Sequence, residues 1–299
     1  MDAMLMDVKR FAVHDGPGIR TTLFLKGCSL KCIWCHNPEG IGAKPQMAYY
    51  EHKCIGCGEC VSVCAQGAQK IGPEGHRFDR SACAACGACE PACLGEAMKR
   101  FGRRVTLEEA LTLALEDAAF YGETGGVTLS GGEPLLQADF CAKMARELKA
   151  RGVSTAIDTC GNVDWIAFEK LLPDAEMFLF DVKHINPEAH RRLTGQTNER
   201  ILQNLRRLSD AGARIEIRMP LVPGCNDDSA TLHGIGQFLG ALRIEKMRVL
   251  PYHSMARSKY RALGMPDTMP DVPSPGDAQI AAAVEILRGY GVEAVSGRA

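Results

Sequence analysis

The stretch Cys28-Ser29-Leu30-Lys31-Cys32-Ile33-Trp34-Cys35 places three cysteines within eight residues, in the spacing C-x3-C-x2-C. A loop this short can wrap around only one metal centre. Three thiolates can bind three irons of a four-iron cluster and leave the fourth iron open, as a catalytic zinc site leaves one position free for chemistry. The alternative is a zinc ion held by these cysteines and His36, but zinc sites usually pair two C-x2-C arms far apart in sequence. The spacing therefore predicts a reactive iron–sulfur cluster.

The residues around this loop add further motifs. Residues 21–27 are predicted to form a buried strand that ends at Gly27. The motif Asp15-Gly16-Pro17-Gly18-Ile19-Arg20 precedes the strand, and His36-Asn37-Pro38-Glu39 follows the cysteines. Together with the cysteine spacing, these motifs resemble the radical S-adenosylmethionine (SAM) superfamily, and within it the activating enzymes of glycyl-radical enzymes. The resemblance runs from about residue 5 to the C-terminus.

The composition limits the class of protein. The chain has 299 residues, is 46% hydrophobic and has a net charge of −1. These values suit a soluble globular protein of one or two domains and offer no electrostatic basis for nucleic-acid binding. Charged residues interrupt the apolar run in residues 1–13, so we expect neither a signal peptide nor a membrane helix there. Fourteen cysteines without a secretory signal favour metal ligation over disulfides. We therefore expect a cytoplasmic, oxygen-sensitive protein that acts anaerobically and binds no membrane.

Residues 45–101 differ from the rest of the chain, because Cys, Gly and Ala dominate and apolar periodicity disappears. We interpret them as an inserted domain. Residues 1–44 would begin a barrel and carry the cluster loop, and residues 102–299 would complete it. Without the insert, the chain has about the ~250 residues typical of one α/β barrel.

The insert contains a repeat in which Cys54, Cys57, Cys60 and Cys64 recur 29 residues later as Cys83, Cys86, Cys89 and Cys93. Each half has the C-x2-C-x2-C-x3-C run of bacterial two-cluster ferredoxins, in which the fourth cysteine of one run binds the other cluster. The predicted ligand sets are therefore Cys54, Cys57, Cys60 and Cys93 for one auxiliary cluster, and Cys83, Cys86, Cys89 and Cys64 for the other. Ala65 and Leu94 stand where ferredoxins have proline. Two four-cysteine zinc sites are the alternative.

After the insert, predicted strands and helices alternate. Thr106 and Glu109 form a capping box that starts the first helix. Strands are predicted over residues 21–27, 126–130, 153–158, 176–182, 214–219, 246–251 and 292–295, and helices over 107–118, 137–151, 165–172, 198–211, 229–242 and 276–289. This order indicates a parallel sheet. We count six core βα units, fewer than the eight of a closed barrel. We therefore expect an α/β fold with an open, partial (βα)6 barrel and a ferredoxin-like insert; the resemblance implies the same barrel.

Polar groups follow the predicted strands. They are the cluster loop, Gly131-Gly132-Glu133-Pro134, Asp158-Thr159-Cys160-Gly161, Asp181 with Lys183, Arg218 with Pro220, and Pro251-Tyr252-His253. Each has an ordinary structural interpretation, such as a helix cap for Asp158 or a salt bridge between Asp181 and Lys183. Six groups at one rim instead favour an active site, because the loops after the strands build the catalytic face of such barrels.

The resemblance implies roles for these residues around SAM. Cys28, Cys32 and Cys35 would hold the cluster, and its open iron would take the amino and carboxylate groups of SAM. Gly131 and Gly132 allow close backbone approach, and with Glu133 they would accept hydrogen bonds from the SAM ammonium. Lys183, a candidate catalytic residue, would pair with the carboxylate and ribose region.

Other side chains would complete the SAM site by the same resemblance. Trp34 would lie against the adenine, and His253 would form a hydrogen bond with it. The remaining candidates for contact with SAM are Cys35, His36, Asp158, Asp181, Val182 and Arg218. A monovalent cation would bind Asp158, Thr159, the Leu179 carbonyl and Asp181, because hard cations prefer oxygen ligands. Cys141, Cys160 and Cys225 lack ligand spacing, and we interpret them as buried apolar residues.

The activity implied is reductive cleavage of SAM to methionine and a 5′-deoxyadenosyl radical, which abstracts a hydrogen atom from a glycine of a partner enzyme. The insert would relay electrons from a donor such as flavodoxin or ferredoxin. Two alternatives remain: a radical SAM enzyme that acts on a small molecule, and an electron carrier without catalysis. The polar rim disfavours the carrier, because a carrier needs no SAM site. The sequence does not identify the partner.

Overall fold

A computed structural model describes residues 1–297 of the chain. Within this range, the main sheet has nine strands in the order β13-β12-β11-β10-β9-β8-β2-β1-β7. The run from β2 to β13 is parallel, and β1 and β7 extend it antiparallel at one edge. The strands span Asp2–Ala12 (β1), Arg20–Leu25 (β2), Arg103–Thr106 (β7), Gly126–Gly131 (β8), Ser154–Thr159 (β9), Met177–Asp181 (β10), Ile215–Leu221 (β11), Lys246–Pro251 (β12) and Ala294–Ser296 (β13). The predicted parallel α/β sheet is confirmed, with β7 and β13 as its edges.

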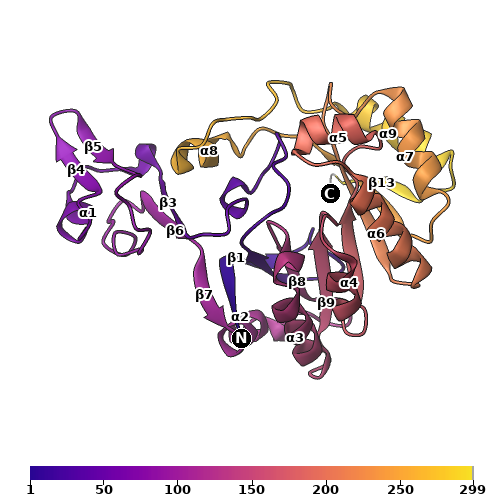
Figure 1. Ribbon diagram of the computed structural model, residues 1–299, viewed down its shortest axis with the longest axis horizontal. Coiled ribbons are helices and arrows are strands. Elements are labelled where there is room, and N and C mark those ends of the chain that lie inside the picture. The colour runs from indigo at the N-terminus through magenta and orange to yellow at the C-terminus, as the bar shows by residue number, and fades with distance from the viewer. Residues whose placement is uncertain (298–299) are drawn as a thin grey trace.

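Most helices of the barrel cover the outer face of the sheet, whereas α8 lies toward the insert (Figure 1). They span Leu107–Leu115 (α2), Ala138–Lys149 (α3), Trp165–Leu171 (α4), Pro187–Thr194 (α5), Glu199–Asp210 (α6), Ser229–Leu239 (α7), Arg257–Leu263 (α8) and Asp277–Arg288 (α9). The apolar faces of the strands and helices form one large core, which includes Leu129, Phe168, Phe178, Ile217 and Leu239. This core fixes the strands, so their C-terminal ends meet at one edge.

Four elements near the site were not predicted. Strand β1 lacks a regular alternation because bulges interrupt its pairing with β2, and β7 covers the four residues before α2. Helix α5 has clear local signals, since Asn186 caps it by accepting from Ala189 N and Pro187 is its first residue. Helix α8 lies between the predicted strand 246–251 and the predicted helix 276–289, where no element was predicted, and it ends at Gly264 in the left-handed conformation.

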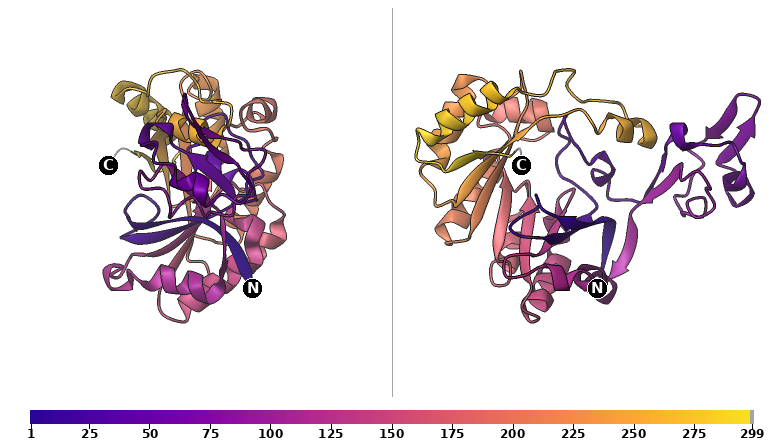
Figure 2. Two further views of the ribbon diagram at one scale, coloured as in Figure 1. Left: turned by 90° about the vertical axis from the view of Figure 1, so that its left-hand side faces the viewer. Right: turned by 180° about the vertical axis from the view of Figure 1, so that it is seen from behind.

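The insert projects away from the barrel (Figures 1 and 2). Its strands β3 (Gln46–Tyr49) and β6 (Met98–Phe101) pair at the neck, and β4 (Gln69–Gly72) and β5 (Gly75–Phe78) form a hairpin near the one-turn helix α1 (Glu59–Ser62). The 29-residue repeat extends to the backbone. Positive φ values occur in pairs at Gly58 and Gly87 (83° and 89°) and at Gly67 and Glu96 (62° and 52°).

One arginine joins the insert to the barrel. The Arg80 guanidinium donates to Met47 O at the neck of the insert (2.9 Å) and to Ala262 O near the end of α8 (2.6 Å). A cation at a helix C-terminus is favourable because the last carbonyls lack partners within the helix. Helix α8 therefore links the insert to the rim of the barrel.

Candidate active site

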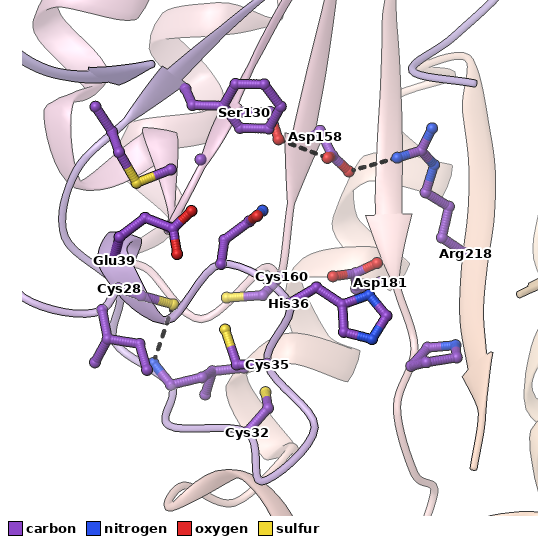
Figure 3. A pocket seen from close by; sticks show the side chains of 18 of the residues that line it. Cys28, Cys32, Cys35, His36, Glu39, Ser130, Asp158, Cys160, Asp181 and Arg218 are labelled. Atoms are coloured by element: carbon purple, nitrogen blue, oxygen red, sulfur yellow. Dashed lines mark hydrogen bonds and ion pairs between the residues drawn. The ribbon is translucent and has the colours of Figure 1, made fainter. Parts of the chain in front are cut away.

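The C-terminal ends of the parallel strands open into a cavity of about 830 Å³. The predicted site residues that line it are Cys28, Cys32, Trp34, Cys35, His36, Gly131, Gly132, Asp158, Thr159, Asp181, Lys183 and Arg218. Figure 3 shows the thiols of the cluster loop on one side and the carboxylates of Asp158 and Asp181 facing them. The fold thus brings together groups from five segments that lie far apart in sequence.

Hydrogen bonds on both sides hold the cluster loop. Cys28 N donates to Ile41 O (3.1 Å), and Lys31 N and Ile33 N donate to the last carbonyls of α5 (2.7 and 2.9 Å). The Tyr260 hydroxyl donates to Cys35 O at 3.1 Å. Across residues 1–297, no set of three or more His, Cys, Asp or Glu side chains is compact enough for a single metal ion. Three thiols spread around one cavity fit a four-iron cluster, in which each sulfur would bind a different iron.

Burial controls the ionisation of these thiols. Removal from water raises the pKa of Cys32 and of Cys35 to about 12, and the charge of Lys183 partly opposes both shifts. The pKa of Cys28 is instead lowered, first of all by a hydrogen bond from Cys160. Thiols must lose their protons to bind metal, so cluster binding is expected to release protons.

Two ion pairs line the side of the cavity opposite the thiols. Asp158 accepts from Ser130 Oγ (2.7 Å), and Arg218 Nη1 lies 3.3 Å from its other oxygen. Asp181 pairs with Lys183. Burial raises the pKa of Asp158, while Arg218 lowers it. Burial opposes the charge of Lys183, but the Asp181 carboxylate keeps the Lys183 pKa above its ordinary value. The site therefore presents both signs of charge, as a zwitterionic amino-acid group requires.

Backbone packing requires glycine at positions 131 and 132, at the end of β8, whether or not a ligand binds there. A Cβ atom on Gly131, whose φ is +127°, would lie 2.0 Å from Leu25 O in β2, and one on Gly132 would lie 2.2 Å from Gly27 O. Both clashes are with the backbone that leads into the cluster loop. Glycine here allows the loop after β8 to pack against the start of the cluster loop, in addition to leaving room for a ligand.

The structure places the Glu133 side chain differently from the prediction. Its carboxylate is fully buried and accepts from Leu135 N (3.0 Å), Cys160 N (2.8 Å) and Thr159 Oγ1 (2.9 Å). These bonds engage the carboxylate that was expected at the SAM ammonium, and they also engage the hydroxyl of Thr159, which was a predicted cation ligand. Glu133 therefore holds the turn after β9 beside the cluster loop.

The aromatic candidates lie around the mouth of the cavity. Trp34 is buried against Val222 and Tyr252. His36 stacks on His253 with ring centroids 4.1 Å apart, and His36 Nε2 lies 2.9 Å from His253 O. Burial lowers the pKa of His36 to about 4, so His36 is neutral at pH 7.

Besides Glu133 and His253, two further predicted residues have side chains outside the cavity lining. Val182 is buried in the main core, and Leu179 packs with Ala156 and Met177 in a small cluster. Residues of a strand alternate between its two faces, and both residues lie in or next to β10. Contact with a ligand would be limited to their backbone atoms.

An ion pair between a half-buried lysine and a buried glutamate at the cavity escaped the sequence analysis. Lys259 Nζ, from α8, lies 2.6 Å from Glu39 Oε1 and also donates to His36 O (3.0 Å) and Asn37 Oδ1 (3.3 Å). Glu39 is 3% exposed. The pair ties α8 to the residues that follow Cys35. Its only sequence signal is the position of Glu39 directly after the cluster loop, because Lys259 is 220 residues away.

The cysteines of the insert gather in two groups. Cys64 lines a cavity of about 200 Å³ together with Cys83, Cys86 and Cys89. Burial raises the pKa of the Cys60 thiol, and the nearby thiols of Cys93, Cys54 and Cys57 raise it further. The two halves of the repeat share an equivalent hydrogen bond to the fourth cysteine. Ala68 N donates to Cys64 Sγ (3.3 Å), and Ala97 N donates to Cys93 Sγ (3.1 Å). Each group thus combines three cysteines of one run with the fourth cysteine of the other.

Comparison with known proteins agrees with this site. The family model of the radical SAM superfamily matches residues 22–233. The isethionate sulfite-lyase activating enzyme of Desulfovibrio desulfuricans is 39% identical over 90% of this chain and 89% of its own length. The indoleacetate decarboxylase activating enzyme of Tractidigestivibacter scatoligenes is 35% identical over 99% and 97%. A solved domain of a pyruvate-formate lyase-activating enzyme from Bacteroides vulgatus is 29% identical, with a TM-score of 0.50 over 57% of this chain and 98% of that domain.

The chain belongs to the radical SAM superfamily, the class that the fold and the three-thiol loop define. Within that superfamily it belongs to the activating enzymes, which act on glycyl-radical partner proteins. The family implies a four-iron cluster and SAM. Among the helices of residues 1–297, none has the length and hydropathy needed to cross a membrane.

Replacement of Asp181 by alanine is expected to weaken SAM binding about tenfold, or about 1.4 kcal/mol, without loss of iron. The change leaves Lys183 buried without its partner, which is costly, and removes a charge from the cavity. Anaerobic calorimetry would measure the affinity. Glu176→Ala is the matched control, because Glu176 forms an exposed ion pair with Arg214 just before the same strand. Equal SAM affinity in the two variants would contradict the assignment.

Proposed function

We propose that this chain cleaves SAM reductively and uses the resulting radical to abstract a hydrogen atom from a glycine of a partner enzyme. The observation that supports this most directly is the three-thiol loop opening into the same cavity as two carboxylates and two cations. Cys28, Cys32 and Cys35 would hold a four-iron cluster, which would supply one electron to the SAM sulfonium so that the S–C5′ bond could break into methionine and a 5′-deoxyadenosyl radical.

The protein would contribute position and electrostatics. Cys28, Cys32 and Cys35 would hold three irons. Asp181 and Lys183 would orient the methionine end of SAM, and the backbone at Gly131 and Gly132 would approach it closely. Trp34 would lie beside the adenine. The predicted cation ligands Asp158 and Asp181 already have basic partners, so a bound cation would compete with Arg218 and Lys183.

We further propose a protein substrate rather than a metabolite. The cavity extends beyond the cluster loop along β1 and is lined there by Asp7, Lys9, Arg10 and Asp15, which leaves room for a peptide segment beside the SAM site. The Arg20 side chain supports the turn that precedes β2. It donates hydrogen bonds to Pro17 O in that turn (3.2 Å) and to Val127 O in β8 (2.6 Å). The relatives are named for different partners, a sulfite-lyase and a decarboxylase, so the name of the partner stays open.

The insert is proposed to carry two auxiliary four-iron clusters that relay electrons from a donor such as flavodoxin or ferredoxin. One cluster would bind Cys54, Cys57, Cys60 and Cys93, and the other Cys83, Cys86, Cys89 and Cys64. The grouping of Cys64 with the second run and the repeated backbone support this assignment. Residues 45–101 would then be the electron-transfer domain.

Iron counts of paired variants test the crossed ligation. The wild-type protein is expected to bind about twelve irons and Cys64→Ala about eight. Because Cys64 and Cys83 would serve one cluster, the double variant Cys64→Ala/Cys83→Ala should also keep about eight. The matched double variant Cys64→Ala/Cys54→Ala should keep only about four, since it breaks both auxiliary clusters. The reverse order of these two iron contents would reject the crossed assignment.

The activity itself is tested by electron paramagnetic resonance. Reduced protein and SAM are mixed without oxygen with a candidate glycyl-radical enzyme, such as one encoded beside this gene. A doublet from a glycine-centred radical is expected, and it should vanish when that glycine of the partner is replaced by alanine. Full turnover of SAM with a small metabolite, with no radical on any cognate partner, would support the small-molecule alternative instead.

A further inference from the structure

Cys160 is a fourth thiol at the core site, without a role in the activity described above. It lies at the end of β9, is 6% exposed, and lines the same cavity as Cys28, Cys32 and Cys35. Figure 3 shows its sulfur pointing at the sulfur of Cys28. Each thiol also acts on the ionisation of the other, because Cys160 lowers the pKa of Cys28 and Cys28 raises the pKa of Cys160. The sequence analysis treated Cys160 as an apolar residue, and this contact calls for a different role.

The turn that carries Cys160 is held rigidly. Cys160 N donates to the buried Glu133 carboxylate (2.8 Å). The next residue, Gly161, has a φ of +75°, and a Cβ atom there would lie 2.2 Å from the ring of Phe180. Asn204 Nδ2 donates to Gly161 O and Val163 O (2.9 and 2.8 Å). A cysteine side chain has one heavy-atom torsion, so a fixed backbone leaves its sulfur few alternative positions.

The cluster loop is attached to the same turn independently of the thiols. Ser29 Oγ donates to Asn162 O (2.9 Å), and Asn162 Nδ2 donates back to Ser29 Oγ (3.2 Å). Leu30 N donates to Cys28 Sγ at 3.4 Å. Ser29 is next to Cys28 and Asn162 lies two residues after Cys160, so these bonds hold the Cys28 and Cys160 thiols facing one another.

We propose that the Cys160 thiol donates a hydrogen bond to the Cys28 thiolate in the loaded enzyme and thereby makes the core cluster easier to reduce. Reduction adds negative charge that is shared with the sulfur ligands, and a donor to one of these sulfurs stabilises the reduced form. Hydrogen bonds to cluster sulfurs are among the factors that set cluster potentials. Cys160 is then a positioning residue that adjusts the potential and binds no iron. This inference rests on the proposed role of Cys28 as a ligand.

The test is the midpoint potential of the core cluster in the anaerobically loaded full chain. The core signal is identified as the paramagnetic resonance signal that changes when SAM is added. Cys160→Ala should lower the equilibrium constant for reduction about tenfold, equivalent to about 59 mV for a one-electron couple. Cys160→Ser keeps a donor and should stay close to wild type. Cys160→Val fills the space without a donor and should behave like alanine.

Iron content and a remote thiol provide the controls. All three variants should keep the iron content of the wild type, because Cys160 is not a ligand. Cys141→Ala is the matched control, because Cys141 is a fully buried thiol outside the cavity that donates to Pro134 O (3.3 Å). The midpoint potential of the core cluster in this variant should equal that of the wild type.

Three outcomes would overturn the inference. An unchanged potential in Cys160→Ala and Cys160→Val, with iron intact, would show that the contact has no effect on the cluster. Loss of about four irons from both variants would make Cys160 a ligand. A wild-type protein without a SAM-responsive signal would reject the proposed function together with this inference.

Discussion

A protein with Cys28, Cys32 and Cys35 all replaced by alanine is expected to lose SAM cleavage completely and to bind about eight irons instead of about twelve. The three thiols are the only cysteines in the cluster loop, and they converge on the cavity that the strand ends form. Without them no iron is held beside the SAM site, so no electron reaches the sulfonium. The eight remaining irons would belong to the insert.

The measurement combines iron analysis with detection of 5′-deoxyadenosine after anaerobic reduction. The control is the double variant Cys141→Ala/Cys225→Ala, which removes two cysteines outside all three predicted ligand sets and should keep both the iron and the activity. SAM cleavage that survives the triple replacement would refute the assignment of the core cluster. A loss of all twelve irons would instead mean that the fold of the insert depends on the core loop.

Gly131→Ala is expected to prevent stable folding, with a loss of about 4 kcal/mol or more. The added Cβ would lie 2.0 Å from Leu25 O and 2.3 Å from Leu25 N. Both atoms belong to the backbone of β2, which pairs with β8 and leads directly to Cys28. Backbone cannot move aside as a flexible side chain can, so the two central strands would have to separate at the point where the cluster loop begins.

Gly152→Ala separates this clash from the ordinary cost of a positive φ. Gly152 has a φ of +72° and no atom within 4 Å of an added Cβ, so alanine there should cost only about 1 kcal/mol. Soluble yield and the apparent melting temperature are suitable measures, because unfolding of a cluster-containing protein with an inserted domain is not two-state. A Gly131→Ala protein as stable as Gly152→Ala would show that β2 and β8 can separate at little cost.

Local patterns made much of this protein readable from its sequence. Ligand spacing within one loop indicated the core site, because a chain of eight residues must bring its own thiols together. The repeat of the cysteine run after 29 residues indicated an insert with two similar halves. Alternating apolar segments gave the six βα units, and the capping box at Thr106 and Glu109 is present in the structure. Even the common rim could be predicted, because parallel strands end at the same edge of a sheet.

The tertiary structure alone decided how side chains from distant segments are paired. Glu133 turned inward to bind the turn after β9, although its motif suggested a hydrogen bond with SAM. Lys259 reached Glu39 from 220 residues away, on a helix that the sequence analysis had not predicted. Cys160, which lacks ligand spacing, came to face Cys28 because Ser29 and Asn162 join their two loops. The sequence determines which groups lie at the rim, since that depends on local order along the chain. The direction and partner of each side chain depend on how loops pack in three dimensions, which no local pattern encodes.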